Sequence, residues 1–504
     1  MNVEFHAQGF SSFTFHTWVK HLERNVFDYT RKVKDCPRKF KKMACSKELL
    51  TEVLPRQQEV LLEQQNVPPG NKNVFSGNKA LLSGKVGVLG PQRPHVSEAG
   101  LREALMLDQG QDARLLSWTR HDFTNKGDNY VADITSVNVK FCQNGRERQV
   151  SYVVKMKHNK RKGCTNDFDD MVFYKEGKFY TELLPLINHE LKSAGMTPLR
   201  VPRCLHAGWN ESQNQLFLED LRPLGFKLHD RKKHLSVSHA ALVLRELAKL
   251  HAASVLFLSK IPKEDLKSKF KFLKWEMFNY SEQTKNAYDV LIRGSLQTAS
   301  ELARAAGSYD MQQWFGTLSV QGTEVLMRQI RESSAFDVIG HGDCWVNNFL
   351  FRYDAAGQPV EVMLLDFQLC RKTSLAYDLN YFLFSSLAPA EKNARLEELI
   401  VTYYTTFREV TRAAGVVMPY TVDDITNEFY NRNMVGLIFG ALAIPALVCD
   451  AQDAQEFDVA SGEHTHNYVI NKRQNALMML KKNPLMSSRL ASLYEDIRIY
   501  AGIA

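Results

Sequence analysis

The first part of the chain carries apolar residues at the spacing of β-strands. Apolar and polar residues alternate over Val137–Phe141, and a second apolar stretch runs over Val150–Met156. Asn144-Gly145 lies between these stretches, and Asn-Gly in such a place is the strongest short signal of a β-hairpin. Gln215–Leu221 predicts one more strand. We therefore expect a small sheet in this part of the chain.

Further along, apolar residues recur every three or four positions, as they do on one side of an α-helix. His239–Ser254 predicts an amphipathic helix in which His251 is a packing residue, and Pro484–Ile499 predicts the last helix. Met434–Cys449 is apolar throughout, but it is shorter than the roughly 20 residues of a membrane-spanning helix and predicts a buried core helix. Two helices are expected near the sheet, over Ser97–Leu107 and Asp167–Leu184.

The order of these elements predicts the fold class. Strands first and helices afterwards indicate an α+β protein of two lobes, and 504 residues are too many for one simple core. Pro223 and Gly225 follow the last predicted strand and mark the change of lobe. We expect an extension over 1–95, a small β-rich N-lobe over 96–222 and a large helical C-lobe over 223–504.

Charge separates the extension from the rest of the chain. Residues 1–95 hold 15 Lys and Arg against 8 Asp and Glu, so they carry nearly all of the formal net charge of +8. The Gly-, Pro- and Asn-rich composition of 66–94 is typical of segments without fixed structure. The basic run Arg31–Lys47 could contact nucleic acid or an anionic surface. Because a solvated tail is the more common explanation of such a run, we predict no specific nucleic acid partner.

The remaining composition indicates an intracellular enzyme. Charged residues and histidines interrupt Met1–Arg24, so a secretory signal is not expected. Eight cysteines are scattered without a CxxC pair, which favours reduced thiols over a disulfide framework. We therefore expect a cytoplasmic protein without a transmembrane segment. The sequence does not indicate an oligomeric state.

Candidate chemistry is concentrated around one predicted hairpin. Two apolar runs, Phe349–Tyr353 and Val360–Phe367, are separated by a turn with Gly and Pro, and antiparallel pairing would bring Asn348 close to Asp366. An amide oxygen and a carboxylate facing one volume suit Mg²⁺, which takes one or two protein oxygens beside substrate phosphates. Asp343 is then left free to accept a proton from an attacking hydroxyl.

The motifs around this hairpin resemble a known family. HGDCWVNN at 341–348, LLDFQ at 364–368 and Tyr377-Asp378-Leu379 resemble the site of the aminoglycoside phosphotransferase and choline kinase superfamily, and most of all its ecdysteroid kinase-like family. The resemblance covers about 97–504 and implies a protein-kinase-like fold. It implies that Asp343 is the catalytic base and that Asn348 and Asp366 are the Mg²⁺ ligands. His341 and Asp378 are the implied supporting residues. Asp378 is expected to cap a helix or hold the catalytic turn.

The predicted N-lobe carries the other half of the resemblance. A glycine-containing loop over a strand-borne lysine is what nucleotide kinases need to offset triphosphate charge. KGDNY at 126–130 and VVKMK at 153–157 are similar to the family's glycine loop and ATP lysine. The resemblance therefore implies that Gly127, Asn129 and Lys155 bind ATP.

Three further ATP-site residues follow from the same resemblance. Glu176 lies in the predicted helix Asp167–Leu184 and is similar to the family's glutamate that pairs with the ATP lysine. Glu219 and Leu221 lie where the chain leaves the N-lobe, and the family reads the adenine edge there with main-chain groups. Their side chains therefore carry little information about the nucleotide.

These features predict an ATP- and Mg²⁺-dependent phosphotransferase acting on a hydroxyl of a small organic molecule. The resemblance implies ecdysteroids or other hydroxylated hormones and xenobiotics as acceptors. Two alternatives remain open, a nucleotide-binding pseudokinase that acts as an interaction platform and a choline- or aminoglycoside-type kinase. A protein kinase proper is disfavoured because HGD and DFQ occupy the places of HRD and DFG, and APE is absent.

Overall fold

The computed structural model describes residues 95–122, 132–157, 167–208, 214–262, 266, 268–274, 280–331, 334–450 and 462–502. All of them belong to one compact unit, Val88–Ala504. The predicted extension up to residue 94 lies outside the described residues, as do Gly127 and Asn129. Expectations about these segments therefore stay predictions.

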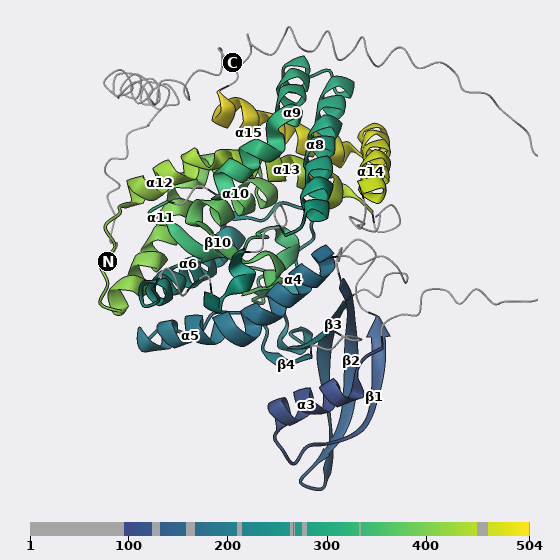
Figure 1. Cartoon of the computed structure of the whole chain (residues 1–504), viewed down its shortest axis with the longest axis vertical. Helices are drawn as coiled ribbons and strands as arrows, with labels where there is room; N and C mark the ends of the chain where they lie inside the picture. The colour runs from purple at the N-terminus through teal and green to yellow at the C-terminus, as the bar shows by residue number, and fades with distance from the viewer. Residues whose placement is uncertain are drawn as a thin grey trace, which may run out of the picture. The chain divides into compact units, whose positions relative to one another are not determined.

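The first lobe is built on a five-stranded antiparallel sheet with the strand order β1-β2-β3-β5-β4 (Figure 1). The predicted hairpin is confirmed: Gln143 pairs with Arg146, and Asn144 and Gly145 both have positive φ, 51° and 71°, as a type I′ turn requires. The strands are β1 (Arg114–Asp122), β2 (Ala132–Gln143), β3 (Arg146–Lys157), β4 (Cys204–Gly208) and β5 (Gln215–Glu219).

One face of this sheet is covered by α3 (Glu98–Gln109), the predicted short helix. Ser97 caps it as expected, accepting a hydrogen bond from the N–H of Gly100 at 3.2 Å. Its buried side chains pack against strand residues such as Val154 and Phe217. Because neighbouring residues of a strand point to opposite faces, Lys155 points away from α3, to the face that meets the rest of the protein.

A continuous helical run crosses between the sheet and the helical lobe (Figure 1). It consists of α4 (Asp167–Lys178), a π-helical turn η1 (Phe179–Leu183) and α5 (Leu184–Ser193). The sequence predicts an end at Leu184, whereas the run continues for nine more residues. Pro185 explains the wide turn, because it has no N–H for the preceding turn and its ring would clash in a regular helix.

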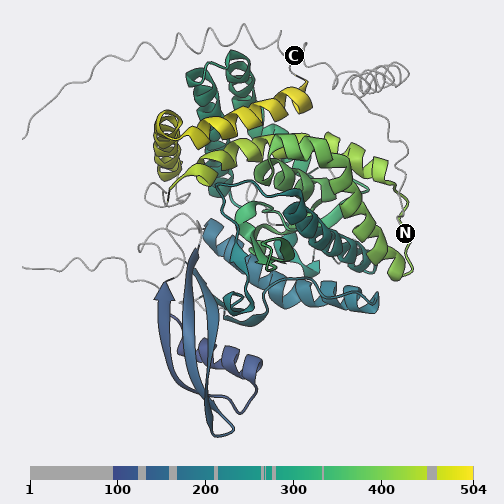
Figure 2. The same ribbon diagram turned by 180° about the vertical axis from the view of Figure 1, so that it is seen from behind.

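The second lobe is helical, and its helices pack side by side in both views (Figures 1 and 2). The predicted core helix is α13 (Asn433–Val448), which is buried and contains Pro445. Among the described residues, no single helix is long and apolar enough to cross a membrane, although α12 and α13, bent by 53°, pass that test as a pair. The helices are α6 (Val237–Ser259), α8 (Glu282–Ala305), α9 (Tyr309–Arg331), α10 (Leu375–Ser386), α11 (Pro389–Ala413), α12 (Val422–Asn431), α13 (Asn433–Val448), α14 (Gly462–Lys482) and α15 (Pro484–Ala501).

Two small sheets in the second lobe carry the segments of interest. The predicted second hairpin is confirmed, with Phe349 paired to Leu364. Phe367 belongs to a short 3-10 turn, Phe367–Leu369, rather than to the strand. The strands are β6 (Lys227–Leu228), β8 (Phe349–Tyr353) and β9 (Pro359–Leu364) in one sheet, and β7 (Asp337–Gly340) and β10 (Arg371–Ser374) in the other. The predicted α+β fold, with a β-rich lobe followed by a helical one, is thus confirmed.

Candidate active site

The two ends of the β8–β9 hairpin meet, as the sequence predicts. The N–H of Leu365 donates to the C=O of Asn348 at 2.9 Å. Asp366, the next residue, is therefore held close to Asn348. Asp366 has φ 64° and ψ 66°, in the left-handed region. This conformation costs roughly 1–2 kcal/mol for a residue with a Cβ, and Asp adopts it more readily than most. Backbone strain of this kind is concentrated at functional sites.

Lys155 makes ion pairs with carboxylates from two different segments. Its Nζ lies 2.5 Å from Oε2 of Glu176 on α4 and 2.9 Å from Oδ1 of Asp366. Burial by itself lowers the pKa of Lys155, but the charges of Asp366 and Glu176 more than offset this and raise it above its ordinary value. The site therefore contains a buried, permanently charged ammonium group.

Two hydrogen bonds fix the side chain of Asp343. Asn348 Nδ2 donates to Asp343 Oδ2 at 2.9 Å, and the Tyr381 hydroxyl donates to Oδ1 at 3.0 Å. Asn348 Nδ2 also donates to the Asp343 C=O at 2.8 Å. Both contacts are made by the amide nitrogen of Asn348, so its Oδ1 takes no part in them. The turn thus presents one carboxylate and one amide oxygen.

The environment of Asp343 changes its affinity for protons. Burial raises the pKa of Asp343 to about 6, and the nearby charge of Asp366 acts in the same direction. The hydrogen bonds from Tyr381 and Asn348 act against this rise. A carboxylate with a pKa close to neutrality is a better general base than an ordinary aspartate.

Asp378 holds the backbone of the turn that carries Asp343. Its Oδ2 accepts from the N–H of His341 at 2.6 Å, and its Oδ1 accepts from the N–H of Gly342 at 2.9 Å. His251 Nε2 lies 3.0 Å from Oδ2. Asp378 is completely buried, and the cap of α10 is Ser374 instead. Asp378 therefore contacts the turn that carries Asp343 and does not cap the helix.

Gly342 allows this turn to approach its neighbours. Its φ is +86°, and a Cβ on Gly342 would lie 2.0 Å from the carbonyl oxygen of Leu369. Only glycine fits here, because any side chain would meet backbone and adopt a disfavoured conformation. His341 Nε2 lies 2.9 Å from the C=O of Leu365. The turn is therefore packed directly against the segment that carries Asp366.

An aromatic stack connects the helical run of the first lobe to Asp366. The rings of Phe179, from η1, and Phe367 are 3.7 Å apart between centroids and nearly parallel, at 4°. The centroid of the Phe367 ring also lies 4.5 Å from that of the His341 ring. The residue after Asp366 thus contacts both the helical run that bears Glu176 and the turn that bears Asp343.

The predicted hinge residues use part of their backbone within the protein. The N–H of Glu219 donates to the C=O of Arg203 at 2.9 Å, and the C=O of Leu221 accepts from Leu224 and Phe226, both at 3.2 Å. An adenine edge would have to use the other main-chain groups, the Glu219 C=O and the Leu221 N–H. These are one acceptor and one donor.

Two contacts at the site were not predicted from the sequence. Tyr381 contacts Asp343 directly, and His251, expected only to pack, bridges Asp378 and the Tyr403 hydroxyl, with 2.7 Å between its Nδ1 and that oxygen. Tyr381 could have been found, because it lies three residues after Asp378 and hence on the same side of a helix. The partner of His251 lies 127 residues away, and no local pattern indicates it.

The oxygens at the ends of the hairpin suit Mg²⁺. Within the parts of the chain that the structure describes, no group of three or more His, Cys, Asp or Glu is placed to hold a metal ion. Mg²⁺ does not need such a group when phosphates and waters complete its coordination. Asn348 Oδ1 and the Asp366 carboxylate are oxygens of the required kind. The residues therefore fit an ion that arrives with a nucleotide.

Fold and site together define a class of protein. A β-rich lobe whose strand lysine pairs with a helical glutamate, joined to a helical lobe that carries the aspartates, is the organisation of protein-kinase-like proteins. The sequence model of the ecdysteroid kinase-like family matches residues 126–416, more than half of the chain. The chain belongs to this family, and so to the kinase-like phosphotransferases.

Comparison with individual proteins gives less detail. Among solved structures, the crystal structure of a "Putative fructosamine-3-kinase" from Haemophilus somnus 129PT matches with 12% sequence identity and a TM-score of 0.31. The match covers 74% of this chain and 97% of that protein. No curated protein is significantly similar in sequence.

Proposed function

We propose that the protein is an ATP- and Mg²⁺-dependent kinase that phosphorylates a hydroxyl of a small organic molecule. The observation that carries this proposal is the position of the Lys155 ammonium, paired with both Glu176 and Asp366. A cation suited to phosphates is thereby placed beside a carboxylate suited to a metal, and the turn of Asp343 packs against the same segment.

The first lobe would bind the nucleotide. Lys155 would exchange its contact with Asp366 for phosphate oxygens, while Glu176 keeps the ammonium in place. The acceptor and donor on the backbone of Glu219 and Leu221 match the amino group and ring nitrogen of an adenine edge. Gly127 and Asn129 are proposed for the loop over the phosphates on the resemblance alone.

The second lobe would supply the metal ligands and the base. Asn348 Oδ1 and Asp366 would hold Mg²⁺, which when bound neutralises charge on the phosphates. Asp343 would orient the acceptor hydroxyl and take its proton as the hydroxyl oxygen bonds to the γ-phosphorus, while the bond from that phosphorus to the bridging oxygen breaks and ADP leaves. His341 and Asp378 would support this base through the turn. Asp378 accepts hydrogen bonds from the backbone N–H groups of His341 and Gly342, the two residues before Asp343.

The experiment is a test of phosphotransfer by the full chain. MgATP is supplied with an ecdysteroid, amino alcohols or phenolic compounds, and ADP formation is measured together with the mass of the acceptor. We expect phosphorylation of at least one acceptor, and we expect Asp343→Asn to bind MgATP while turnover falls by about 10²–10⁴. Full turnover in Asp343→Asn would remove Asp343 as the base.

The same panel separates the alternatives. A pseudokinase that acts as a platform would bind ATP and consume none with any acceptor. A choline- or aminoglycoside-type kinase would phosphorylate the cationic amino alcohols and leave the ecdysteroid unchanged. Because cationic and apolar acceptors need different pocket walls, the pattern of accepted compounds also identifies the substrate class.

A further inference from the structure

We infer that Tyr381 is a positioning residue for phosphotransfer, whose hydroxyl holds the Asp343 carboxylate in the orientation that accepts the proton. The inference rests on the proposed function. Its basis is the hydrogen bond of 3.0 Å from the Tyr381 hydroxyl to Asp343 Oδ1. Tyr381 is argued to act through Asp343 and to have no separate chemical step.

One side of α10 fixes both the backbone and the carboxylate of the turn. Asp378 accepts the N–H groups of His341 and Gly342, and Tyr381, three residues later, reaches the side chain of Asp343. The Tyr377 hydroxyl donates to the C=O of Gly342 at 3.4 Å. Because three residues of a single rigid helix contact one short turn, the position of Asp343 relative to α10 is strongly determined.

The carboxylate of Asp343 can still accept a hydrogen bond from a substrate hydroxyl. Each carboxylate oxygen has two acceptor sites; Tyr381 occupies one on Oδ1, and Asn348 occupies one on Oδ2. A donor on each oxygen prevents rotation of the carboxylate about the Cβ–Cγ bond. If the Tyr381 hydroxyl is removed, Asn348 alone sets the orientation, and the carboxylate can turn toward other donors.

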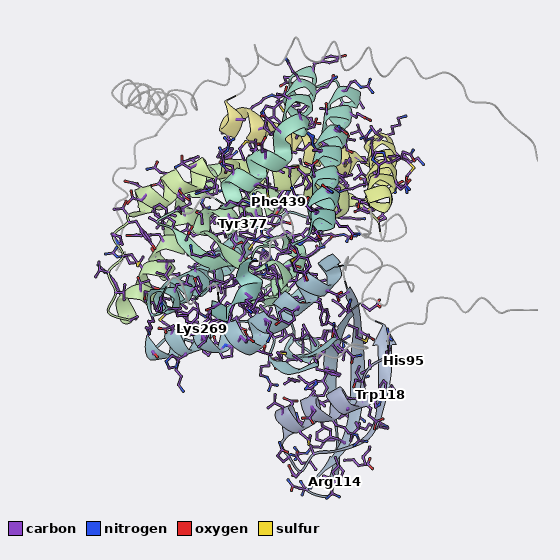
Figure 3. All side chains as sticks on the ribbon, in the orientation of Figure 1. His95, Arg114, Trp118, Lys269, Tyr377 and Phe439 are labelled. Carbon is purple, nitrogen blue, oxygen red and sulfur yellow. The ribbon has the colours of Figure 1, made fainter. Side chains whose placement is uncertain are left out.

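The Tyr381 ring is fixed by packing that does not involve its hydroxyl. It stacks on Phe439 of α13, with centroids 4.3 Å apart and an interplanar angle of 16°, and only 8% of Tyr381 is exposed. Phe439 also lies 6.0 Å from Tyr377, and both are labelled in the helical lobe in Figure 3. Tyr381→Phe should therefore keep the packing and remove one donor.

A double-mutant cycle tests the inference. Phosphotransfer is measured in the full chain with MgATP and the first acceptor of the panel that wild type phosphorylates. We expect Tyr381→Phe to lower kcat about 10- to 100-fold, because small misplacement of a reacting group is costly, and to leave KM for ATP unchanged. In the Asp343→Asn background the same change should cost no more than about twofold, since residues acting as a unit are non-additive.

Two further variants control for packing. Tyr494→Phe removes a buried hydroxyl on α15 that has no hydrogen-bond partner within the described parts of the chain, and it should leave kcat unchanged. Phe439→Leu keeps the Tyr381 hydroxyl but loosens the packing of its ring. It should lower kcat less than Tyr381→Phe does, and again only when Asp343 is present. This variant tests the inference even if Tyr381→Phe does not fold. Equal losses in both backgrounds, or no loss in wild type, would overturn the inference. A wild-type chain that phosphorylates no acceptor would overturn the proposed function as well.

Discussion

Replacing Asp378 by Asn should separate the support of the catalytic turn from ordinary packing. The carboxylate is completely buried and accepts hydrogen bonds from His341 N–H, Gly342 N–H and His251. Burial alone would raise the pKa of Asp378, but the hydrogen bond and charge of His251 and the Gly342 N–H hold it below its ordinary value. The group is therefore an anion with three donors.

The expected loss of stability follows from the hydrogen bonds that Asp378 accepts. Asn keeps the volume of Asp378 but offers one acceptor oxygen, so one backbone N–H would face an NH₂ group. A buried donor without an acceptor costs about 1–3 kcal/mol, and the remaining hydrogen bonds lose the contribution of the charge. We expect Asp378→Asn to lower the free energy of unfolding by about 2–5 kcal/mol and to reduce kcat, because the turn of Asp343 loses its anchor.

The assay compares this variant with a matched buried carboxylate. Asp496 on α15 is 2% exposed and pairs with Lys392 at 2.9 Å, and it takes no part in the proposed site. Urea unfolding followed by circular dichroism gives stability, and phosphotransfer is measured where both variants are folded. Asp496→Asn should lose stability and keep its turnover. The reasoning is refuted if Asp378→Asn is as active as wild type, or if both variants lose turnover equally.

Two further predictions concern stability. Gly342→Ala should lower the free energy of unfolding, measured in urea, by more than about 3 kcal/mol because a Cβ there meets backbone. Gly357 also has a positive φ (+77°), but a Cβ there would meet no atom within 4 Å, so Gly357→Ala should lower it by about 1 kcal/mol. Equal losses in the two variants would contradict the steric argument. Burial lowers the pKa of His239 to about 4 from 6.5, so its contribution to stability is complete above pH 6.5 and is lost as pH falls toward 4. Between pH 7 and pH 5, the free energy of unfolding of His239→Gln should therefore fall by about 1 kcal/mol less than that of wild type. An equal fall in both proteins would exclude His239 as the source of this pH dependence.

Much of the fold follows from local sequence patterns. The Asn144-Gly145 turn fixes the register of β2 and β3, so alternation around it was enough to predict the strand that carries Lys155. The second hairpin is equally local, since its two apolar runs and turn determine that Asn348 and Asp366 lie together. Where a structure depends on neighbours in the chain, periodicity and turn chemistry therefore predicted it.

The remaining features depend on distant partners or on one exceptional residue. The helical run continues past Leu184 because a π-helical turn accommodates Pro185. From the sequence alone, a proline at this position indicates the end of a helix. His251 and Tyr381 look like ordinary residues of amphipathic helices. Their roles depend on which turn packs against α6 and α10, which only the folded chain determines.

The most direct test of the account is the structure of the chain with Mg²⁺ and a non-hydrolysable ATP analogue. We predict one Mg²⁺ bound about 2.1 Å from Asn348 Oδ1 and from the Asp366 carboxylate, with a phosphate oxygen on Lys155 and with Asp343 hydrogen-bonded to Tyr381 and free of the ion. A nucleotide whose metal ion contacts neither Asn348 nor Asp366 would contradict the central claim.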